Sequence, residues 1–398
     1  MSSVTITGTN SQSVVLNYDA NANLALAQTL AAQINYDIAI AKTIVGSPGA
    51  PPPTLTGSQT GILFQSTEQA VLPAKYTVDV INVVGDAEVS GNNHAGQEIL
   101  SDAATNLTFH TSGGSGTVAA GGGTNSLLVG GSGNWLLSTG NGPNTITDAG
   151  SGNTTIQGGT GSNTIQLGSG TDLVYSTGQD FITAGTGAAT ILASASSSDL
   201  IFGGDGSIDF VGASANVTIA GTTGSVTIQG TSGSEYVQGG SDGNNLLTAG
   251  TGTASLFGGG TGDVLTAKAA NQLLYAGSGN ETLKAYGNDT VYAGSGHDKI
   301  NAGLGSDTFV GGSGYATITA TGTTSNLFEF VANNGPGTLE VSGYHTAQEA
   351  NIKVHLDGVT TIAGGQNVTG GNLTLTLSDG TTVKFDNVTQ TLGSSNFV

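Results

Sequence analysis

The sequence predicts an all-β protein: a right-handed parallel β-roll or β-solenoid of nonapeptide repeats, with a small α+β segment before it and a β-rich cap after it. Three features of the 398 residues predict this fold. Bulky apolar residues recur at steps of nine, glycine accounts for 67 residues, and Thr or Ser flanks most of the apolar positions. Internal repetition of this kind indicates stacked units, each of which contacts only its neighbours.

One bulky apolar residue follows each glycine turn and is expected to point inward. Nine residues can form a turn and a short strand in which only the central side chain points inward, so two nonapeptides complete one coil. Glycine is required where the turns need positive φ or where stacked backbones approach closely. The expected inward residues are Leu128, Leu137, Ile146, Ile156, Ile165, Val174, Ile182, Ile191, Ile201, Phe210, Ile219, Ile228, Val237, Leu247, Leu256, Leu265, Leu274, Leu283, Val291, Ile300, Phe309, Ile318 and Leu327.

Residues 1–120 are predicted to form the α+β segment. Apolar residues at intervals of three and four predict a helix over about 21–46, which is expected to pack on the rest of the fold or cap one end of it, or else to join a partner helix. The stretch SPGAPPPT at 47–54 reads as a stiff proline-rich connector. Alternating or wholly apolar runs between 60 and 110 predict β-strands.

The repeats are predicted to occupy residues 121–328, and residues 329–398 to form the β-rich cap. Within the cap, LTLTLSDGTTVKFDNV at 373–388 has two alternating runs around Ser378-Asp379-Gly380, which predicts a β-hairpin. Each coil alone buries little apolar surface, so stability is collective and the ends of the roll need covering.

Composition excludes several classes of protein. Seven Lys and Arg against 27 Asp and Glu give a net charge of −20, which argues against nucleic acid and anionic lipid as partners. The absence of Cys excludes disulfides and thiolate metal sites. No run of about 18 apolar residues occurs, so no transmembrane segment is expected. None of the five His has a recognisable nucleophile or metal-ligand spacing, and we expect no enzyme.

Four stretches carry the sequence pattern GGxGxDxUx, where U is a bulky apolar residue, most closely. They are GGGTGDVLT from Gly258, AGSGNETLK from Ala276, AGSGHDKIN from Ala293 and AGLGSDTFV from Ala302. The pattern is similar to the hemolysin-type calcium-binding nonapeptide repeat of RTX proteins. The resemblance implies calcium held by turn carbonyls and aspartates. It also implies an extracellular or cell-surface protein exported by a type 1 machine without an N-terminal signal peptide, and the chain begins with no such signal.

The resemblance implies an ion between turns that lie one coil, about 18 residues, apart on the same side of the roll. Calcium takes six to eight oxygen ligands, which the carbonyls and carboxylates of two turns can supply. Where Asn or Thr replaces the acid, hydrogen bonds to neighbouring backbone can hold the turn, and the acids themselves can be read as solvated turn residues. The expected pairs are Asp263 with Glu281, Glu281 with Asp298, Asp289 with Asp307, and as a further candidate Asp180 with Asp199.

Two functions remain open. The dominance of the repeats and the low charge density favour a structural protein that self-assembles into a cell-surface layer, a fibre or filament, or an extracellular (biofilm) matrix. The alternative is an RTX-type adhesin or binding module that recognises a surface glycan or a host, with a surface polysaccharide as its partner. In either case calcium is expected to fold the roll cooperatively, because binding free energy adds to folding free energy.

Overall fold

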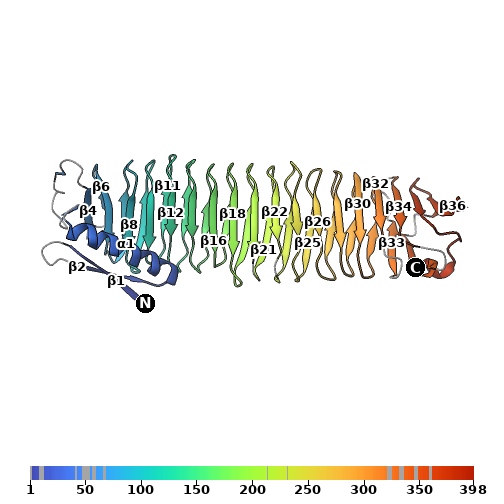
Figure 1. Cartoon of the computed structure of the whole chain (residues 1–398), viewed down its shortest axis with the longest axis horizontal. Helices are drawn as coiled ribbons and strands as arrows, with labels where there is room; N and C mark the ends of the chain where they lie inside the picture. The colour runs from blue at the N-terminus through green and yellow to red at the C-terminus, as the bar shows by residue number, and fades with distance from the viewer. Residues whose placement is uncertain are drawn as a thin grey trace. The chain divides into compact units, whose positions relative to one another are not determined.

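The structure is a computed structural model, and it describes residues 2–8, 13–40, 43–46, 54–55, 60–65, 69–212, 214–230, 232–320, 325–330, 336–344, 348–357 and 361–398. Most of the regular structure in these ranges is β-strand. The chain divides into two compact units, Met1–Ser207 and Ile208–Val398. Each unit is a stack of parallel β-coils (Figure 1). The predicted all-β parallel solenoid is therefore confirmed.

In the first unit, alternate strands build two parallel sheets, here called the first and the second sheet. The first sheet contains, in spatial order, β3 (Thr43–Gly46), β4 (Thr60–Gln65), β6 (Tyr76–Ile81), β8 (Gln97–Ser101), β10 (Gly116–Ala120), β12 (Trp135–Ser138), β14 (Thr154–Gln157), β16 (Asp172–Ser176) and β18 (Ala189–Ala193). The second sheet contains β5 (Gln69–Val71), β7 (Gly85–Ser90), β9 (Thr105–His110), β11 (Ser126–Val129), β13 (Thr145–Asp148), β15 (Thr164–Gln166), β17 (Phe181–Thr183) and β19 (Ser198–Phe202).

The second unit repeats this arrangement. Its first sheet contains β20 (Ile208–Gly212), β22 (Val226–Gln229), β24 (Leu246–Thr248), β26 (Val264–Thr266), β28 (Thr282–Ala285), β30 (His297–Ala302), β32 (Tyr315–Thr319), β34 (Thr338–Ser342), β38 (Thr382–Phe385), β37 (Asn372–Leu377) and β36 (Ile362–Thr369). Its second sheet contains β21 (Asn216–Ala220), β23 (Glu235–Gln238), β25 (Ala254–Phe257), β27 (Leu273–Tyr275), β29 (Thr290–Tyr292), β31 (Thr308–Val310), β33 (Asn326–Phe330) and β35 (Ile352–Leu356).

The core of each unit is formed by the inward side chains of the two sheets. Successive inward residues lie in register on neighbouring strands, as Ile156 with Val174 and Leu265 with Leu283 show. Each pair lies 18 residues apart along the chain, so two nonapeptides make one coil. All of the expected inward residues except the first and the last are at most 2% exposed. Burial of each such aliphatic side chain stabilises the fold by roughly 1.5–3 kcal/mol.

Two of the inward residues were predicted wrongly, one at each end of the series. Leu128 is 42% exposed, and its neighbour Leu127 is buried in register with Ile146 instead. Leu327 is half-buried, and Phe328 takes the inward position. At both places two large apolar residues are adjacent, so composition cannot decide between them. Pairing with the neighbouring strand decides, because a shift of one residue turns a side chain to the opposite face.

The N-terminal residues cover the outer face of the first sheet in the first unit. An antiparallel hairpin of β1 (Ser2–Thr7) and β2 (Ser13–Tyr18) packs with α1 (Asn21–Ala39) against that sheet (Figure 1). Ala27, Ala31 and Ile34 of the helix are buried in this cluster. The predicted helix is therefore present, and of the two expected placements, packing or capping, it shows packing against the side of the coils.

The helix is shorter than the predicted range of about 21–46. It ends at Ala39, and Thr43–Gly46 forms β3, which pairs in parallel with β4. The run Thr43-Ile44-Val45 is β-branched and suits a strand better than a helix. The predicted connector at 47–54 lies, apart from Thr54, outside the described residues.

Parallel pairing extends beyond the predicted repeat range of 121–328. Before it, β4, β6, β8 and β10 pair in sequence; after it, β34 pairs in parallel with β38. The hairpin expected at 373–388 is confirmed as β37 and β38, with Gly380 at φ 92° in its turn. Two short 3₁₀ helices, η2 (Glu349–Asn351) and η3 (Ser394–Asn396), complete the described elements. The division into three domains stays a prediction.

Candidate calcium-binding turns

The glycine turns stack so closely that a side chain would not fit at several positions. A Cβ atom on Gly296 would overlap the carbonyl oxygen of Gly279, one coil earlier. Gly294 has φ 58°, and a Cβ atom there would overlap the carbonyl oxygen of Gly277. The turns therefore bring backbone carbonyls of successive coils together, which explains why the repeat retains glycine at these places.

The acids of the repeat pattern stand where each turn leads into its strand, and their side chains point inward. One carboxylate oxygen of each aspartate in the set accepts a hydrogen bond from the backbone N–H at the same position one coil earlier, whereas Glu281 accepts none. Asp289 N donates to Asp307 Oδ1 over 2.9 Å, and Glu281 N donates to Asp298 Oδ1 over 3.0 Å. The acids therefore form ladders that join neighbouring coils. All seven expected residues are between 1% and 4% exposed: Asp180, Asp199, Asp263, Glu281, Asp289, Asp298 and Asp307.

The structure brings together each pair of acids that the repeat spacing predicted. In the first sheet of the second unit, the register of β26, β28 and β30 aligns Asp263, Glu281 and Asp298 in that order. In the second sheet of the same unit, β29 and β31 align Asp289 with Asp307. In the first unit, β17 and β19 align Asp180 with Asp199, and Asp180 N donates to Asp199 Oδ1 over 3.2 Å.

Several of these buried carboxylates have oxygen atoms without a hydrogen-bond partner. Both oxygens of Glu281 lack one, and so does the Oδ2 atom of each of four aspartates, namely Asp180, Asp199, Asp298 and Asp307. Asp263 and Asp289 differ, because their Oδ2 atoms accept turn N–H groups from Gly259 over 2.7 Å and Tyr286 over 3.1 Å. A buried charge without a partner is costly, so these oxygens are positioned for a cation or a proton.

Burial and the charge of neighbouring acids raise the pKa of four of the carboxyls whose oxygens lack a partner, as follows. Burial, with the nearby carboxyls of Asp298 and Asp263, raises the pKa of Glu281 to about 9. Burial, with the charge of Asp289, raises the pKa of Asp307 to about 6. Burial likewise raises the pKa of Asp199 to about 6 and raises that of Asp180. Without a cation, these carboxyls therefore bind protons more readily than exposed carboxyls do, and Glu281 does so most strongly.

The donor set fits calcium better than a transition metal. Calcium prefers carboxylate and carbonyl oxygens, and the buried acids and the glycine carbonyls of the turns offer both. In the described ranges no group of three or more His, Cys, Asp or Glu gathers, so any ion here needs backbone carbonyls as well. The described ion pairs lie elsewhere, between Lys384 and the acids Glu340 and Asp386, and between His110 and Glu88.

Neutral residues replace the acids over much of the first unit, and they hold the turns by hydrogen bonds alone. Asn125 N donates to Asn144 Oδ1 over 3.1 Å, and Asn144 N donates to Asn163 Oδ1 over 3.2 Å. The Asn144 amide also donates to the carbonyl of Gly142 over 2.7 Å. In these turns, side-chain hydrogen bonds to the backbone take the place of calcium, as expected where Asn replaces the acid.

Asp172 is a buried acid of the same type that was not among the expected ligands. Its Oδ1 accepts a hydrogen bond from Thr154 N over 2.9 Å, and burial raises its pKa to about 6. The signal is present in the sequence, since GSGTDLV at 168–174 has both the glycines and the acid of the repeat pattern. Asp148, nearby, accepts a hydrogen bond from the Thr154 hydroxyl over 2.6 Å.

Stacked glycine turns with buried carboxylates at their ends define a parallel β-solenoid of nonapeptide repeats. The chain is an RTX-repeat protein: four segments match the RTX calcium-binding nonapeptide repeat, at residues 148–180, 218–246, 257–285 and 285–318. This family of repeats binds calcium. The matched segments contain Asp172 and all of the expected ligands except Asp199.

No curated protein matches the chain. Among the described residues, no helix is long and apolar enough to cross a membrane.

Proposed function

We propose that the protein is a secreted, non-enzymatic structural protein, a calcium-stabilised β-roll that self-assembles into a cell-surface layer, fibre or extracellular matrix. RTX-repeat proteins are generally secreted, and they are typically structural or binding proteins. The coils dominate both units, and charged residues make up only 9% of the chain. The net charge of −20 makes copies of the chain repel one another, and calcium bound at the turns would reduce this repulsion, which favours assembly that depends on calcium.

The observation that carries self-assembly is the edge strand β36 of the second unit. Among the described strands it pairs only with β37, so its other side presents backbone N–H and C=O groups. Its sequence, IAGGQNVT, has no charge, and six of its eight residues are exposed. A bulge lies between Ile362 and Gln366, which leaves Gln366–Thr369 as the regular part of the edge. Such an edge can receive a strand from a second copy of the chain.

Calcium would be held in the proposed pairs of turns. Asp289 with Asp307 is one such site, and Glu281 with its neighbours Asp263 and Asp298 is another; Asp180 with Asp199 forms the third. When bound, the ion supplies positive charge that offsets the desolvation of the carboxylates. The unpartnered oxygens of Glu281 and Asp307 support this assignment.

The test is the assembly state of the full chain in millimolar CaCl₂ and in EGTA. Sedimentation velocity and negative-stain electron microscopy are expected to show filaments or sheets with calcium and smaller species with chelator. A Mg²⁺ arm at equal ionic strength separates specific binding from charge screening, because Mg²⁺ demands a tighter octahedral shell. Monomers under all three conditions would contradict self-assembly, and far-UV circular dichroism unchanged by EGTA would contradict calcium-dependent folding.

A further inference from the structure

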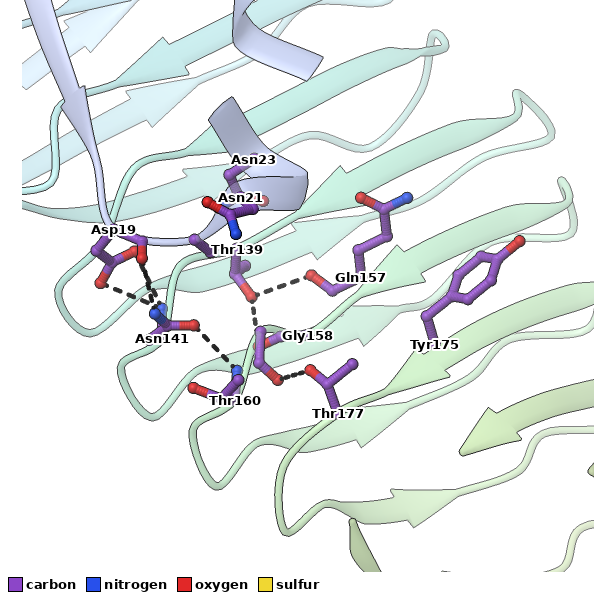
Figure 2. Close-up of a pocket in the computed structure, with 12 residues that line it drawn as sticks. Asp19, Asn21, Asn23, Thr139, Asn141, Gln157, Gly158, Thr160, Tyr175 and Thr177 are labelled. Atoms are coloured by element: carbon purple, nitrogen blue, oxygen red, sulfur yellow. Dashed lines mark hydrogen bonds between the residues drawn. The ribbon is translucent and has the colours of Figure 1, made fainter. Parts of the chain in front are cut away.

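A pocket of about 460 Å³ lies in the first unit, where the start of α1 meets the coils of β12, β14 and β16 (Figure 2). Helix residues form one wall, glycine turns form the floor, and side chains on the outer face of the first sheet form the other wall. The lining residues are Asp19, Ala20, Asn21, Asn23, Thr139, Asn141, Gln157, Gly158, Gly159, Thr160, Tyr175 and Thr177. The volume falls in the range of small-molecule sites.

Hydrogen bonds fix the helix wall against the coils. Asn141 N donates to the carboxylate of Asp19 over 3.2 Å, and the Asn141 amide donates to the Asp19 carbonyl over 2.9 Å. Thr160 N in turn donates to Asn141 Oδ1 over 3.2 Å. On the floor, the hydroxyl of Thr139 donates to the Gly158 carbonyl over 3.1 Å (Figure 2). The polar groups are therefore already arranged without a ligand, which lowers the entropic cost of binding.

The second wall combines an aromatic ring with an amide. Gln157 and Tyr175 lie in register on β14 and β16, and Figure 2 shows both side chains projecting from the sheet in the same direction. Tyr175 is 38% exposed, so one part of its ring is available. The Gln157 Oε1 atom accepts a hydrogen bond from Ser138 Oγ over 3.1 Å, which orients its amide. An apolar ring beside fixed amide donors is suited to a ligand with one apolar face and a rim of hydroxyl groups.

The charge of the lining residues limits which ligands the pocket can bind. Asp19 is the one charged residue in the lining, and no Lys, Arg or His is present there. Phosphate, sulfate and uronate groups would meet a carboxylate and no cation, in a chain whose net charge is −20. The amides of Asn21, Asn141 and Gln157 instead offer hydrogen bonds to neutral hydroxyls.

We propose that this pocket binds an uncharged hexopyranose unit of a polysaccharide, which stacks on Tyr175 and exchanges hydrogen bonds with Gln157, Asn141 and Asp19. The pocket is open on one side, so a unit within a longer chain can enter as well as a terminal one. This site is independent of self-assembly, because its residues all belong to the first unit and β36 belongs to the second.

The test is isothermal titration of the full chain with neutral hexasaccharides of gluco, manno and galacto type, and with an oligogalacturonate. At least one neutral sugar is expected to bind at millimolar or lower concentration, and the uronate is expected not to bind. Tyr175→Ala is expected to weaken binding by at least tenfold, and Gln157→Ala by about five- to tenfold. Tyr175→Phe, which keeps the ring, is expected to bind within about threefold of the unmodified chain.

Tyr36→Ala is the matched control. Tyr36 is 60% exposed on α1 and does not line the pocket, so its removal is expected to leave sugar binding unchanged. Circular dichroism of each variant checks that the fold persists. The proposal is overturned if no neutral sugar binds the unmodified chain, if Tyr175→Ala and Tyr36→Ala bind equally well, or if the uronate binds best.

Discussion

The backbone N–H of Asp289 donates to Oδ1 of Asp307 over 2.9 Å, while Oδ2 of Asp307 is buried without a hydrogen-bond partner. One carboxylate thus has two roles. Its first oxygen joins two coils, which an amide can also do, as the Asn125–Asn144–Asn163 ladder shows. Its second oxygen is buried without a partner, so it is stabilised only when a cation binds in the turn or a proton binds to the carboxylate. Substitutions can separate these roles.

Asp307→Asn is expected to keep the ladder and remove the ion. In EGTA at pH 7, the free energy of unfolding should equal or exceed that of the unmodified chain, because a buried charge is replaced by a neutral acceptor. In saturating calcium, the stabilisation should fall by ~1–3 kcal/mol, since an ion at 100 times its Kd contributes about 2.7 kcal/mol. Thermal and denaturant unfolding with and without calcium measures both effects.

The matched control for that substitution is Asp242→Asn, which alters an exposed acid in another turn. It is expected to leave both the calcium-free stability and the calcium response within about 0.5 kcal/mol of the unmodified chain. Equal losses of calcium response in the two variants would contradict the assignment of a site to Asp307.

Asn144→Ala should destabilise the first unit whether or not calcium is present. The change removes the acceptor for Asn125 N and for the Asn125 amide, at 3.1 and 2.8 Å, and the donor to Gly142. Unsatisfied buried groups of this kind cost ~2–4 kcal/mol in total. Asn153→Ala is the control, because exposed Asn153 accepts a bond from Thr171 N and should cost less than about 1 kcal/mol. A calcium-dependent loss in Asn144→Ala would argue against a purely hydrogen-bonded ladder.

Gly296→Ala should be among the most damaging single substitutions in the second unit. Its Cβ atom would overlap the carbonyl of Gly279, so the stacked turns would have to separate, at a cost of ~3 kcal/mol or more. Gly370→Ala is the comparison, because Gly370 has φ 62° but no heavy atom lies within 4 Å of the added Cβ. Only the left-handed backbone conformation should then reduce the free energy of unfolding, by ~1–2 kcal/mol. Similar losses in equilibrium unfolding would mean that backbone strain, and not the stacking of turns, sets the need for glycine.

The sequence predicts the coils well because a single repeated constraint governs them. Each nonapeptide must bring its turn close to the backbone of the neighbouring coil and bury one aliphatic side chain in its strand. The first requirement places glycine, and the second places Leu, Ile or Val, at intervals of about nine residues. The same spacing places Asp289 and Asp307 one coil apart, and the register of β29 and β31 aligns them. Prediction failed where the period does not discriminate, as between Leu127 and Leu128.

Features that do not follow the nine-residue repeat could not be predicted from the sequence. Strands β4, β6 and β8 lack the glycine turns of the repeat, so their parallel stacking is fixed only by tertiary packing. The placement of α1 on the side of the coils depends on matching its small buried residues to that sheet face. The pocket beside Tyr175 exists only because of this placement, which brings Asp19 next to Asn141, 122 residues away in the chain.

Asp79 should make the stability of the first unit pH-dependent. It occupies the inward position of β6 in register with Ile99, it is fully buried, and neither carboxylate oxygen has a hydrogen-bond partner among the described residues. Burial raises its pKa from 3.8 to about 8. The folded state therefore binds more protons than the unfolded state between these values, and the free energy of unfolding falls as pH rises, by up to about 1.4 kcal/mol per pH unit.

Asp79→Asn should remove this slope. Relative to the unmodified chain, the variant is expected to be no more stable at pH 4 and clearly more stable at pH 9, with most of the difference developing between pH 4 and 8. Denaturant unfolding of both proteins in the same buffer measures it, because the turn acids are common to both and their titration cancels in the difference. Parallel pH profiles for the two proteins would show that Asp79 is solvated or paired in solution.

The edge strand β36 gives the sharpest test of self-assembly, because charge can be placed on it without touching the core. Lysine on an edge strand discourages pairing with another chain, and Asn367 and Thr369 are both exposed in its regular part. The double variant Asn367→Lys, Thr369→Lys is expected to stay monomeric in calcium at concentrations where the unmodified chain assembles. Its free energy of unfolding should change by less than about 1 kcal/mol.

A charge-matched control, Asn153→Lys with Thr171→Lys, adds the same two charges on exposed turns of the first unit. If the loss of assembly came from net charge alone, both double variants would fail to assemble equally. Only the β36 variant should fail if copies join through the strand edge, since backbone pairing needs a close approach that lysine at the edge obstructs. Sedimentation velocity of the three proteins in the same calcium buffer distinguishes these cases. If the β36 variant assembles at the same protein concentration as the unmodified chain, the edge strand does not mediate assembly.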